Sequence, residues 1–418
     1  MGFVRVERNK MGRFTRSIVI CGAGSLVLLM FPLSLRASAI QPNATLTAKT
    51  AKLNISARVR SVHHLGFRFR SPWEHSGSNG EVRISSHYSA TLKSPALGTT
   101  TTTTVAPSTT TAAPATTVAP ISLLRGVYMG PADPTGVQSF VTSSSTGVTI
   151  ASDYLPGGNG WSGMDGTGGS INWLTDAWKS TGYTLSLGVP MIPTDSSGQL
   201  QGTLALGATG AYNGYFTTLA TTLVSAGEGN AYLRLGWEFD GNWYPWQAQS
   251  AASEADYAAY FRQIVTAMRA VPGAAFRFVW NPDASAFVSK SYSLSLAYPG
   301  DAYVDVIGLD LYDFNYVSPT EAGAWSAFEN QLSQANAFAT THSKPLALCE
   351  WGVASTAVHG FGDDPTYIDN MVTWMKSHNV EYESYFNSNT RASNNGVNFN
   401  LIGGGFPNSL AAFTADLG

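Results

Sequence analysis

The sequence contains little cysteine and few charged residues. Its 418 residues include two Cys, and only 12% are charged, about half of the usual share. Two cysteines exclude a disulfide scaffold and a zinc cluster built on cysteine. The chain also has no G-x-S-x-G nucleophile elbow and no phosphate-binding P-loop. The histidines beyond residue 120 are His342, His359 and His378. Their spacing is not that of metal ligands, so we expect neither a metal nor another cofactor.

What the chain does contain is apolar and aromatic. The apolar share is 44%, with 42 Gly and 11 Trp, which fits one sizeable globular unit with appendages. Charge is distributed unevenly along it. Residues 1–120 carry 14 Lys and Arg against 3 acidic residues, whereas residues 121–418 carry 10 against 24. The acidic character of the larger part argues against nucleic acid as a partner.

The first 39 residues resemble a targeting segment. A basic lead is followed by an apolar run over 18–35 and by the small residues Ala37-Ser38-Ala39. This order is typical of a secretory signal peptide. We therefore expect a secreted or cell-envelope-associated protein without a transmembrane domain after cleavage. An uncleaved membrane anchor remains the alternative.

Two further segments precede the main domain. Residues 40–97 are basic and show few periodic apolar positions, so we expect a poorly ordered segment; contact with an anionic envelope is the alternative. Residues 98–120 contain 11 Thr and 3 Pro and cannot build a core. They predict a linker of the kind found in modular extracellular proteins. The remaining residues, 121–418, suit one large domain, which we expect to be a monomer.

Short apolar segments recur through this domain and alternate with helical patterns. One helix follows a capping box expected at 253–256, and others run through 325–338 and open at 366–369. Eight strands alternating with helices in about 300 residues predict a (β/α)8 TIM barrel. An open doubly wound sheet is the alternative, but it normally has a glycine-rich phosphate loop after its first strand, which is missing here. The predicted strands are 124–129, 148–154, 183–190, 231–237, 276–280, 304–310, 345–350 and 381–387.

Two glutamates lie at the ends of predicted strands. Glu238 follows the fourth strand and Glu350 ends the seventh, and both have a neighbouring Trp. Chemistry in such barrels takes place where the strands end. Glycoside hydrolysis requires two carboxylates, one protonated and one ionised, and a short gap between them leads to retention of configuration. Cys349 precedes Glu350, so strand alternation predicts a buried, unreactive thiol turned away from the mouth.

Aromatic and polar side chains surround both glutamates. Sugar rings stack on indole through their C–H faces, while carboxylate and amide groups bind their hydroxyls. A packing role is the alternative for each Trp. The residues expected to bind substrate on this reasoning are Trp237, Asp240, Asn242, Trp243, Trp246, Trp280 and Trp351.

Three segments resemble motifs of glycoside hydrolase family 26, a clan A family of retaining barrel enzymes. They are residues 233–243, 304–312 and 347–352, and the resemblance extends over about 121–418. It implies that Glu238 is the acid/base and Glu350 the nucleophile. The resemblance further implies that Tyr312 hydrogen-bonds the nucleophile, and that Trp243 and Asp310 belong to the central sugar site.

The resemblance implies a hydrolase that cleaves a β-linked polysaccharide. The first candidate activity is that of an endo-β-1,4-mannanase. One position departs from the family, which usually has His before the acid/base where this chain has Trp237. Mannan specificity is therefore left open. The alternatives are the same catalysis on β-1,3-xylan, mixed-linkage glucan or a cell-envelope polysaccharide, or a barrel that binds carbohydrate without cleaving it.

Overall fold

The computed structural model describes residues 123–289, 292–390, 396–403 and 405–418, together with the backbone of four short N-terminal strands. The chain divides into two units, Met1–Ala112 and Ala113–Gly418. In the first unit, β1 (Gly2–Val6) pairs antiparallel with β2 (Arg16–Ile20), and β3 (Leu46–Thr47) with β4 (Glu81–Val82). All other residues of the predicted signal peptide, basic segment and linker lie outside the described residues.

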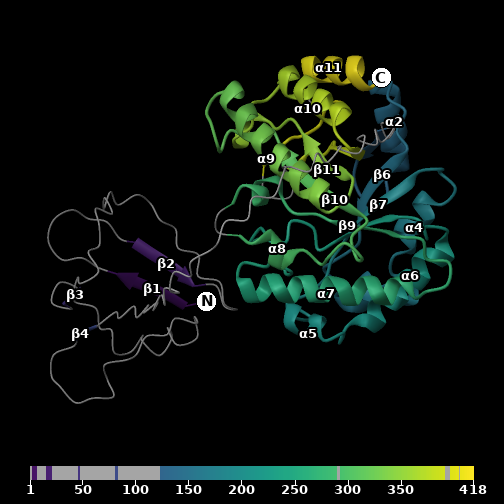
Figure 1. Cartoon of the computed structure of the whole chain (residues 1–418), viewed down its shortest axis with the longest axis vertical. Coiled ribbons are helices and arrows are strands. Elements are labelled where there is room, and N and C mark those ends of the chain that lie inside the picture. Colours follow the sequence, from purple (N-terminus) through teal and green to yellow (C-terminus); the bar gives the residue numbers. More distant parts are fainter. Residues whose placement is uncertain are drawn as a thin grey trace, which may run out of the picture. The chain divides into compact units, whose positions relative to one another are not determined.

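The second unit is a closed barrel of eight parallel strands, which confirms the predicted fold (Figure 1). Each strand pairs with its sequence neighbour, and β12 closes the barrel against β5. All eight predicted strands are present within a few residues of their expected bounds. They are β5 (Leu124–Tyr128), β6 (Ile150–Tyr154), β7 (Thr184–Val189), β8 (Tyr232–Leu235), β9 (Arg277–Trp280), β10 (Val306–Tyr312), β11 (Leu346–Gly352) and β12 (Val380–Phe386).

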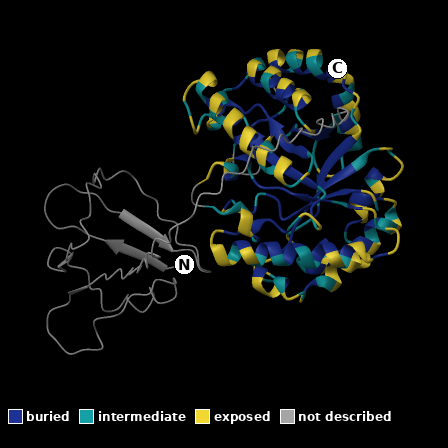
Figure 2. Cartoon of the chain, viewed as in Figure 1, coloured by how far each residue is buried: buried dark blue, intermediate teal, exposed yellow. Residues whose placement is uncertain are grey.

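Helices surround the strands and present their exposed faces outward (Figure 2). Among the described residues, no helix is both long and apolar enough to cross a membrane. The α-helices are α2 (Pro134–Ser144), α3 (Gly160–Met164), α4 (Asn172–Trp178), α5 (Leu204–Ala208), α6 (Asn213–Ala226), α7 (Ala251–Arg269), α8 (Leu294–Ala297), α9 (Glu321–Thr341), α10 (Pro365–Ser377) and α11 (Pro407–Leu417). Short 3-10 turns are η5 (Thr167–Gly169), η6 (Ala284–Phe287) and η7 (Thr356–Val358).

The capping box of α7 lies three residues earlier than predicted. The Ser250 side chain accepts from the Ser253 backbone N–H, and the Ser253 side chain accepts from the Ser250 backbone N–H. The sequence prediction was wrong because a run of Ser and acidic residues offers more than one cap at the right spacing. The apolar helical spacing from Tyr257 to Met268 is as expected, and that face is buried.

A β-bulge in β11 determines how Glu350 is presented. Leu309 of β10 pairs with Leu348, but the next residue, Asp310, pairs with Glu350. Cys349 is therefore an extra residue, and the two side chains after Leu348 no longer follow simple alternation. The thiol of Cys349 is buried among residues of the barrel interior, 3.2 Å from the Tyr382 hydroxyl.

Burial raises the pKa of the Cys349 thiol to about 12. The expectation of a buried, unreactive thiol is therefore confirmed. Simple alternation would place this side chain on the outer, helix-facing side of the strand, but the bulge leaves it inside the barrel, in contact with Tyr382.

Candidate active site

The turn after β8 holds Glu238 in an uncommon backbone conformation. Gly236 and Glu238 have φ angles of 55° and 50°, which a residue with a side chain rarely adopts. A Cβ atom on Gly236 would also lie 2.5 Å from the Met191 sulfur. The Glu238 N–H donates to the Asn281 carbonyl oxygen at 2.8 Å, and its carbonyl accepts from the Gly241 N–H at 3.0 Å. Strain held in this way by surrounding contacts is a feature of functional sites.

Glu350 is buried at the end of β11, and both of its oxygens accept hydrogen bonds. Its Oε1 atom accepts from the Tyr154 hydroxyl at 2.6 Å and from an Arg234 guanidinium nitrogen at 2.5 Å. Its Oε2 atom accepts from the Tyr312 hydroxyl at 2.7 Å. Three donors therefore surround this one carboxylate. They also fix the orientation of the carboxylate plane.

Arg234 connects these groups from inside the barrel. It is completely buried, and its Nε–H donates to the Asn281 side-chain oxygen at 2.6 Å. Its Nη2 atom lies 3.0 Å from Asp310 Oδ2 as well as 2.5 Å from Glu350. Its single positive charge therefore faces two carboxylates. Burying a carboxylate is costly unless it is paired or hydrogen-bonded, and Arg234 pairs with both Asp310 and Glu350.

Three carboxylates converge at the mouth of the barrel. Glu238, Asp310 and Glu350 each offer an oxygen, and these oxygens all lie within 4.8 Å of one another. Carboxylates so grouped are capable of holding a cation, but here Arg234 already pairs with Asp310 and Glu350. The pKa of Glu238 is raised well above its usual range, first by burial and then by the charges of Glu350 and Asp310. Burial and the neighbouring carboxylates therefore favour the protonated form of Glu238.

Trp243 and Trp237 lie on either side of Glu238 in the chain but have different environments. Trp243 is 58% exposed, and its indole N–H donates to Glu238 Oε2 at 2.8 Å. Trp237 is buried, with its ring 5.2 Å from that of Tyr154, and its N–H donates to the Tyr244 hydroxyl at 2.9 Å. Trp243 is thus the indole that a sugar ring can reach.

Trp246 packs against both Trp237 and Tyr244. It is 3% exposed, and its ring stacks on Tyr244 at 4.6 Å between centroids. Its N–H donates to the Trp237 carbonyl oxygen at 2.8 Å. Trp246 therefore positions Trp237 and Tyr244, and it offers little surface to a ligand.

Two tryptophans expected to bind substrate lie in the core instead. Trp280 on β9 is fully buried, donates to the Ala297 carbonyl oxygen and stacks on Phe338 of α9. Trp351 on β11 is fully buried and donates to Glu383. Both side chains pack outside the strands, so no face of either ring is available to a sugar. The expectation was wrong because nearness to a strand end does not tell which side of the strand a side chain occupies.

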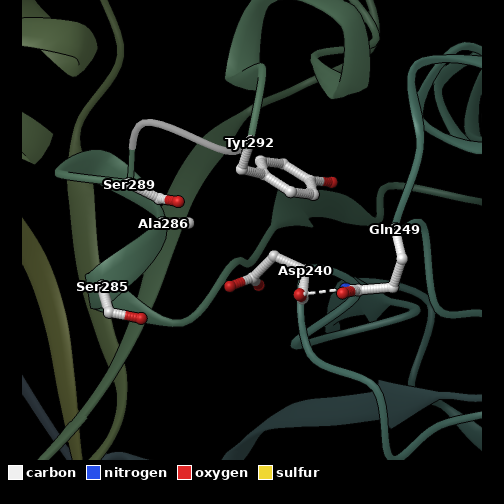
Figure 3. A pocket seen from close by; sticks show the side chains of 6 residues that line it. All are labelled: Asp240, Gln249, Ser285, Ala286, Ser289 and Tyr292. Atoms are coloured by element: carbon white, nitrogen blue, oxygen red, sulfur yellow. Dashed lines mark hydrogen bonds between the residues drawn. The ribbon is translucent and has the colours of Figure 1, made fainter. Parts of the chain in front are cut away.

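The other predicted binding residues lie near the glutamates in different ways. Asp310 and Tyr312 contact Arg234 and Glu350 directly. Asn242 is exposed in the loop after Glu238, and no hydrogen bond joins its side chain to either glutamate. Asp240 lines a separate polar pocket, together with Gln249, Ser285, Ala286, Ser289 and Tyr292 (Figure 3).

Four residues of the site were not singled out from the sequence, namely Tyr154, Arg234, Tyr244 and Asn281. A signal existed for three of them. Tyr154 and Asn281 stand at the ends of predicted strands, and Arg234 is a charge in the apolar segment 233–235. A charge within a buried strand implies a buried partner. The part played by Tyr244 depends on its contact with Trp237, which no spacing reveals.

The sequence and the fold of this chain are similar to those of known proteins. Residues 224–345 match the family model of glycosyl hydrolase family 26. Endoglucanase H of Acetivibrio thermocellus is 28% identical over 148 residues, which are 35% of this chain and 16% of that protein. A mannan endo-1,4-beta-mannosidase of Bifidobacterium adolescentis is 28% identical over 167 residues, 39% of this chain and 16% of that protein. The chain matches only about a sixth of the length of these curated relatives.

Among solved structures, a modular endo-beta-1,4-mannanase from Cellulomonas fimi has a similar fold. The sequence identity is 20%, the match covers 70% of each chain, and the TM-score is 0.51. At this level of identity the similarity concerns the barrel fold.

Proposed function

Because this barrel is related to glycosyl hydrolase family 26, as its motifs predicted, we propose that the chain is a retaining glycoside hydrolase acting on a β-linked polysaccharide. Glu238 is its acid/base and Glu350 its nucleophile. The observation that carries the proposal is the separation of at most 4.8 Å between oxygens of the two carboxylates. Retaining enzymes have carboxyl groups about 5–5.5 Å apart, whereas inverting enzymes leave a wider gap for a water molecule.

In the first step, Glu350 attacks the anomeric carbon and the bond to the leaving-group oxygen breaks. Glu238 donates its proton to that oxygen, so that the leaving sugar departs as an alcohol. Oε2 is the better placed attacking atom because it accepts one hydrogen bond, from Tyr312. Oε1 is held by Tyr154 and Arg234 and becomes the carbonyl oxygen of the glycosyl ester.

In the second step, a water molecule attacks the same carbon and gives its proton to Glu238, and the ester bond to Glu350 breaks. The charge on Glu350 is absent while the ester exists. Because that charge is one cause of the raised pKa of Glu238, the pKa falls in the intermediate. Glu238 is then ionised and acts as a base. One residue thus serves as acid and base in turn.

The substrate class follows from the aromatic surface and the relatives. Trp243 offers an exposed indole face beside the acid/base, suited to the C–H face of a pyranose ring. A β-1,4-mannan is the first candidate, since one curated relative is named a mannan endo-1,4-beta-mannosidase. A β-glucan is the second, since the other is named an endoglucanase and Trp237 stands where family 26 usually has His. We further propose that the protein acts outside the cell, on the strength of the signal-like segment.

Two variants test the catalytic assignment. Glu350→Ala removes the nucleophile and abolishes turnover of every substrate. Glu238→Ala abolishes cleavage of polysaccharide but spares aryl glycosides with activated leaving groups, which depart without a proton. A reducing-sugar assay on mannan, glucomannan, lichenan, β-1,3-xylan and cell-wall polysaccharide identifies the substrate. Equal loss on both substrate types in Glu238→Ala refutes its role, and wild-type inactivity on all of these glycans favours a carbohydrate-binding barrel.

A further inference from the structure

The segment between β7 and β8 carries no charged residue over 32 consecutive positions, 196–227. Residues 121–418 contain 10 basic and 24 acidic residues, so an average stretch of this length would carry three or four. The segment includes α5 and α6, which pack against α7 in the outer layer of helices (Figure 1). Charged side chains normally cover much of such an outer surface. Their absence here marks this surface as different from the rest of the domain.

An exposed aromatic ring lies on this segment, with one of its faces already covered. Tyr215 of α6 is 38% exposed, and its ring stacks on that of Trp161, with centroids 4.6 Å apart and planes inclined by 4°. Trp161 is buried, and its indole N–H donates to the Gln201 carbonyl oxygen at 3.0 Å. The parallel stack fixes the orientation of the Tyr215 ring and leaves its other face toward solvent. A flat, rigid ring of this kind suits the C–H face of a sugar.

Two exposed leucines lie shortly before α6, on the loop and helix that adjoin this aromatic stack. Leu200 and Leu206 are 57% and 53% exposed. Between them, the Thr203 N–H donates to the Tyr212 hydroxyl at 3.2 Å, and the Tyr212 ring lies 4.8 Å from that of Trp161. These contacts hold the leucine-bearing segments against the stack. We call the resulting surface the neutral face, and its exposed apolar members are Leu200, Leu206 and Tyr215.

Hydroxyl groups continue the neutral face along α6. Thr217 and Thr218 are exposed, and their hydroxyls donate to the carbonyl oxygens of Asn213 and Gly214 at 3.1 and 3.0 Å. Each hydroxyl oxygen therefore keeps lone pairs that can accept a hydrogen bond from a ligand. Asp195 precedes the segment, and its carboxylate accepts hydrogen bonds from neighbouring Ser and Gln side chains. The neutral face thus offers apolar contacts and hydroxyl acceptors without a charge of its own.

This chemistry selects one class of partner. Charged groups usually steer and align a specific protein partner, and an anionic lipid or nucleic-acid surface requires basic residues. Residues 196–227 supply neither kind of group. A neutral polysaccharide has C–H faces that fit tyrosine and leucine, and hydroxyls that fit threonine, and it needs no charge on the protein.

The neutral face is built from other strands than the carboxylate pair. Its residues follow β6 and β7, whereas Glu238 follows β8 and Glu350 lies on β11. We propose that the neutral face is a second carbohydrate-binding surface, which holds the domain on an insoluble, uncharged polysaccharide and takes no part in bond cleavage. It rests on the proposed function only in that the partner of a polysaccharide-cleaving enzyme is taken to be a polysaccharide.

The first measurement is binding, as the partition of the full chain between solution and insoluble mannan or cellulose. Glu350→Ala serves as the parent, so that the polysaccharide is not consumed. Adding Tyr215→Ala should lower the partition coefficient about tenfold and adding Leu206→Ala about threefold, because each removes apolar contact with the polymer. Tyr215→Phe keeps the ring and should bind like the parent. Leu296→Ala on α8, where Leu296 is 42% exposed, is the matched control and should also bind like the parent.

The second measurement is cleavage, as kcat/KM on a soluble oligosaccharide of the same glycan, with Glu350 intact. Tyr215→Ala should leave this value unchanged, because the neutral face lies outside the catalytic cleft. A fall in kcat/KM as large as the fall in partition would show that the face extends the cleft, and would overturn the proposal. Unchanged partition in both Tyr215→Ala and Leu206→Ala would also overturn it. So would a parent protein that sediments as a dimer which these two substitutions convert to a monomer.

The two proposals can fail separately. A protein that binds insoluble polysaccharide through Tyr215 but cleaves no glycan would support the neutral face and refute the hydrolase. A protein that cleaves soluble oligosaccharide but binds no insoluble polysaccharide would do the reverse. Leu206 is 53% exposed, so Leu206→Ala decides the question even if Tyr215→Ala fails to fold.

Discussion

Replacing Trp243 by Phe should change the pH dependence of the enzyme in a specific direction. The Trp243 indole N–H donates to Glu238 Oε2 at 2.8 Å, and this bond favours the ionised form of Glu238. Burial and the charge of Glu350 act in the opposite sense. Removing the N–H while keeping an aromatic ring should therefore raise the pKa of Glu238 further.

The size of the effect follows from the exposure of the bond. A hydrogen bond to a charged group contributes about 1.5–3 kcal/mol. Trp243 is 58% exposed, so water replaces part of the lost hydrogen bond. We therefore take the lower limit of this range, about 1.5 kcal/mol, as the expected effect. About 1.5 kcal/mol corresponds to about a tenfold higher ratio of protonated to ionised Glu238 at a given pH.

The assay is the pH profile of kcat/KM, combined with burst kinetics on an aryl glycoside. Because the first step needs protonated Glu238, the alkaline limb of kcat/KM should move to higher pH. Because the second step needs ionised Glu238, hydrolysis of the glycosyl-enzyme should become slower at acidic pH. The phenol released in the first step should then appear in a burst before the steady state. Loss of sugar stacking lowers kcat/KM at all pH values but does not move the limb.

Two further variants make this test specific. Gly241→Ala should reproduce the shift, because a Cβ atom there would collide with the Trp243 ring. Trp173→Phe on α4, 46% exposed, is the matched control and should behave like the wild type. An alkaline limb that stays in place or moves to lower pH in a folded Trp243→Phe enzyme would refute the reasoning.

Three other predictions concern stability and domain structure. Arg234→Met should lower the free energy of unfolding, measured in urea, by about 3–5 kcal/mol, because it leaves the buried Asp310 and Glu350 without their cation. Adding Asp310→Asn to this variant should recover part of the loss. Full wild-type stability of the single variant would contradict the ion-pair role of Arg234. The pKa of Asp240 is raised to about 7, mainly by burial, so its contribution to stability is complete below about pH 4 and is lost as the pH rises through about 7. Calorimetry should therefore show a smaller fall in Tm from pH 5 to pH 8 in Asp240→Asn than in the wild type, and an equal fall would count against it. Residues 121–418 alone should fold and keep activity on soluble substrate; an insoluble or inactive truncated protein would place the domain boundary elsewhere.

The sequence alone was sufficient for the barrel and for the position of its two glutamates. Strand and helix patterns are local, and eight alternations admit few architectures other than a closed barrel. Residues that directly follow such strands meet at one end of the barrel. Glu238 and Glu350 both lie at such strand ends, so the order of strands along the chain is enough to predict that they meet.

Only the tertiary structure decided how the site is assembled. Arg234 on β8 pairs with Asp310 on β10 and with Glu350 on β11. These contacts join segments that are far apart in the sequence, so local spacing does not encode them. The bulge at Cys349 leaves that residue and Glu350 both inside the barrel, because strand register is fixed by pairing between strands and not by alternation within one. Trp280 and Trp351 flank the site in sequence yet pack in the core, since the side of a strand that a residue occupies depends on that same register.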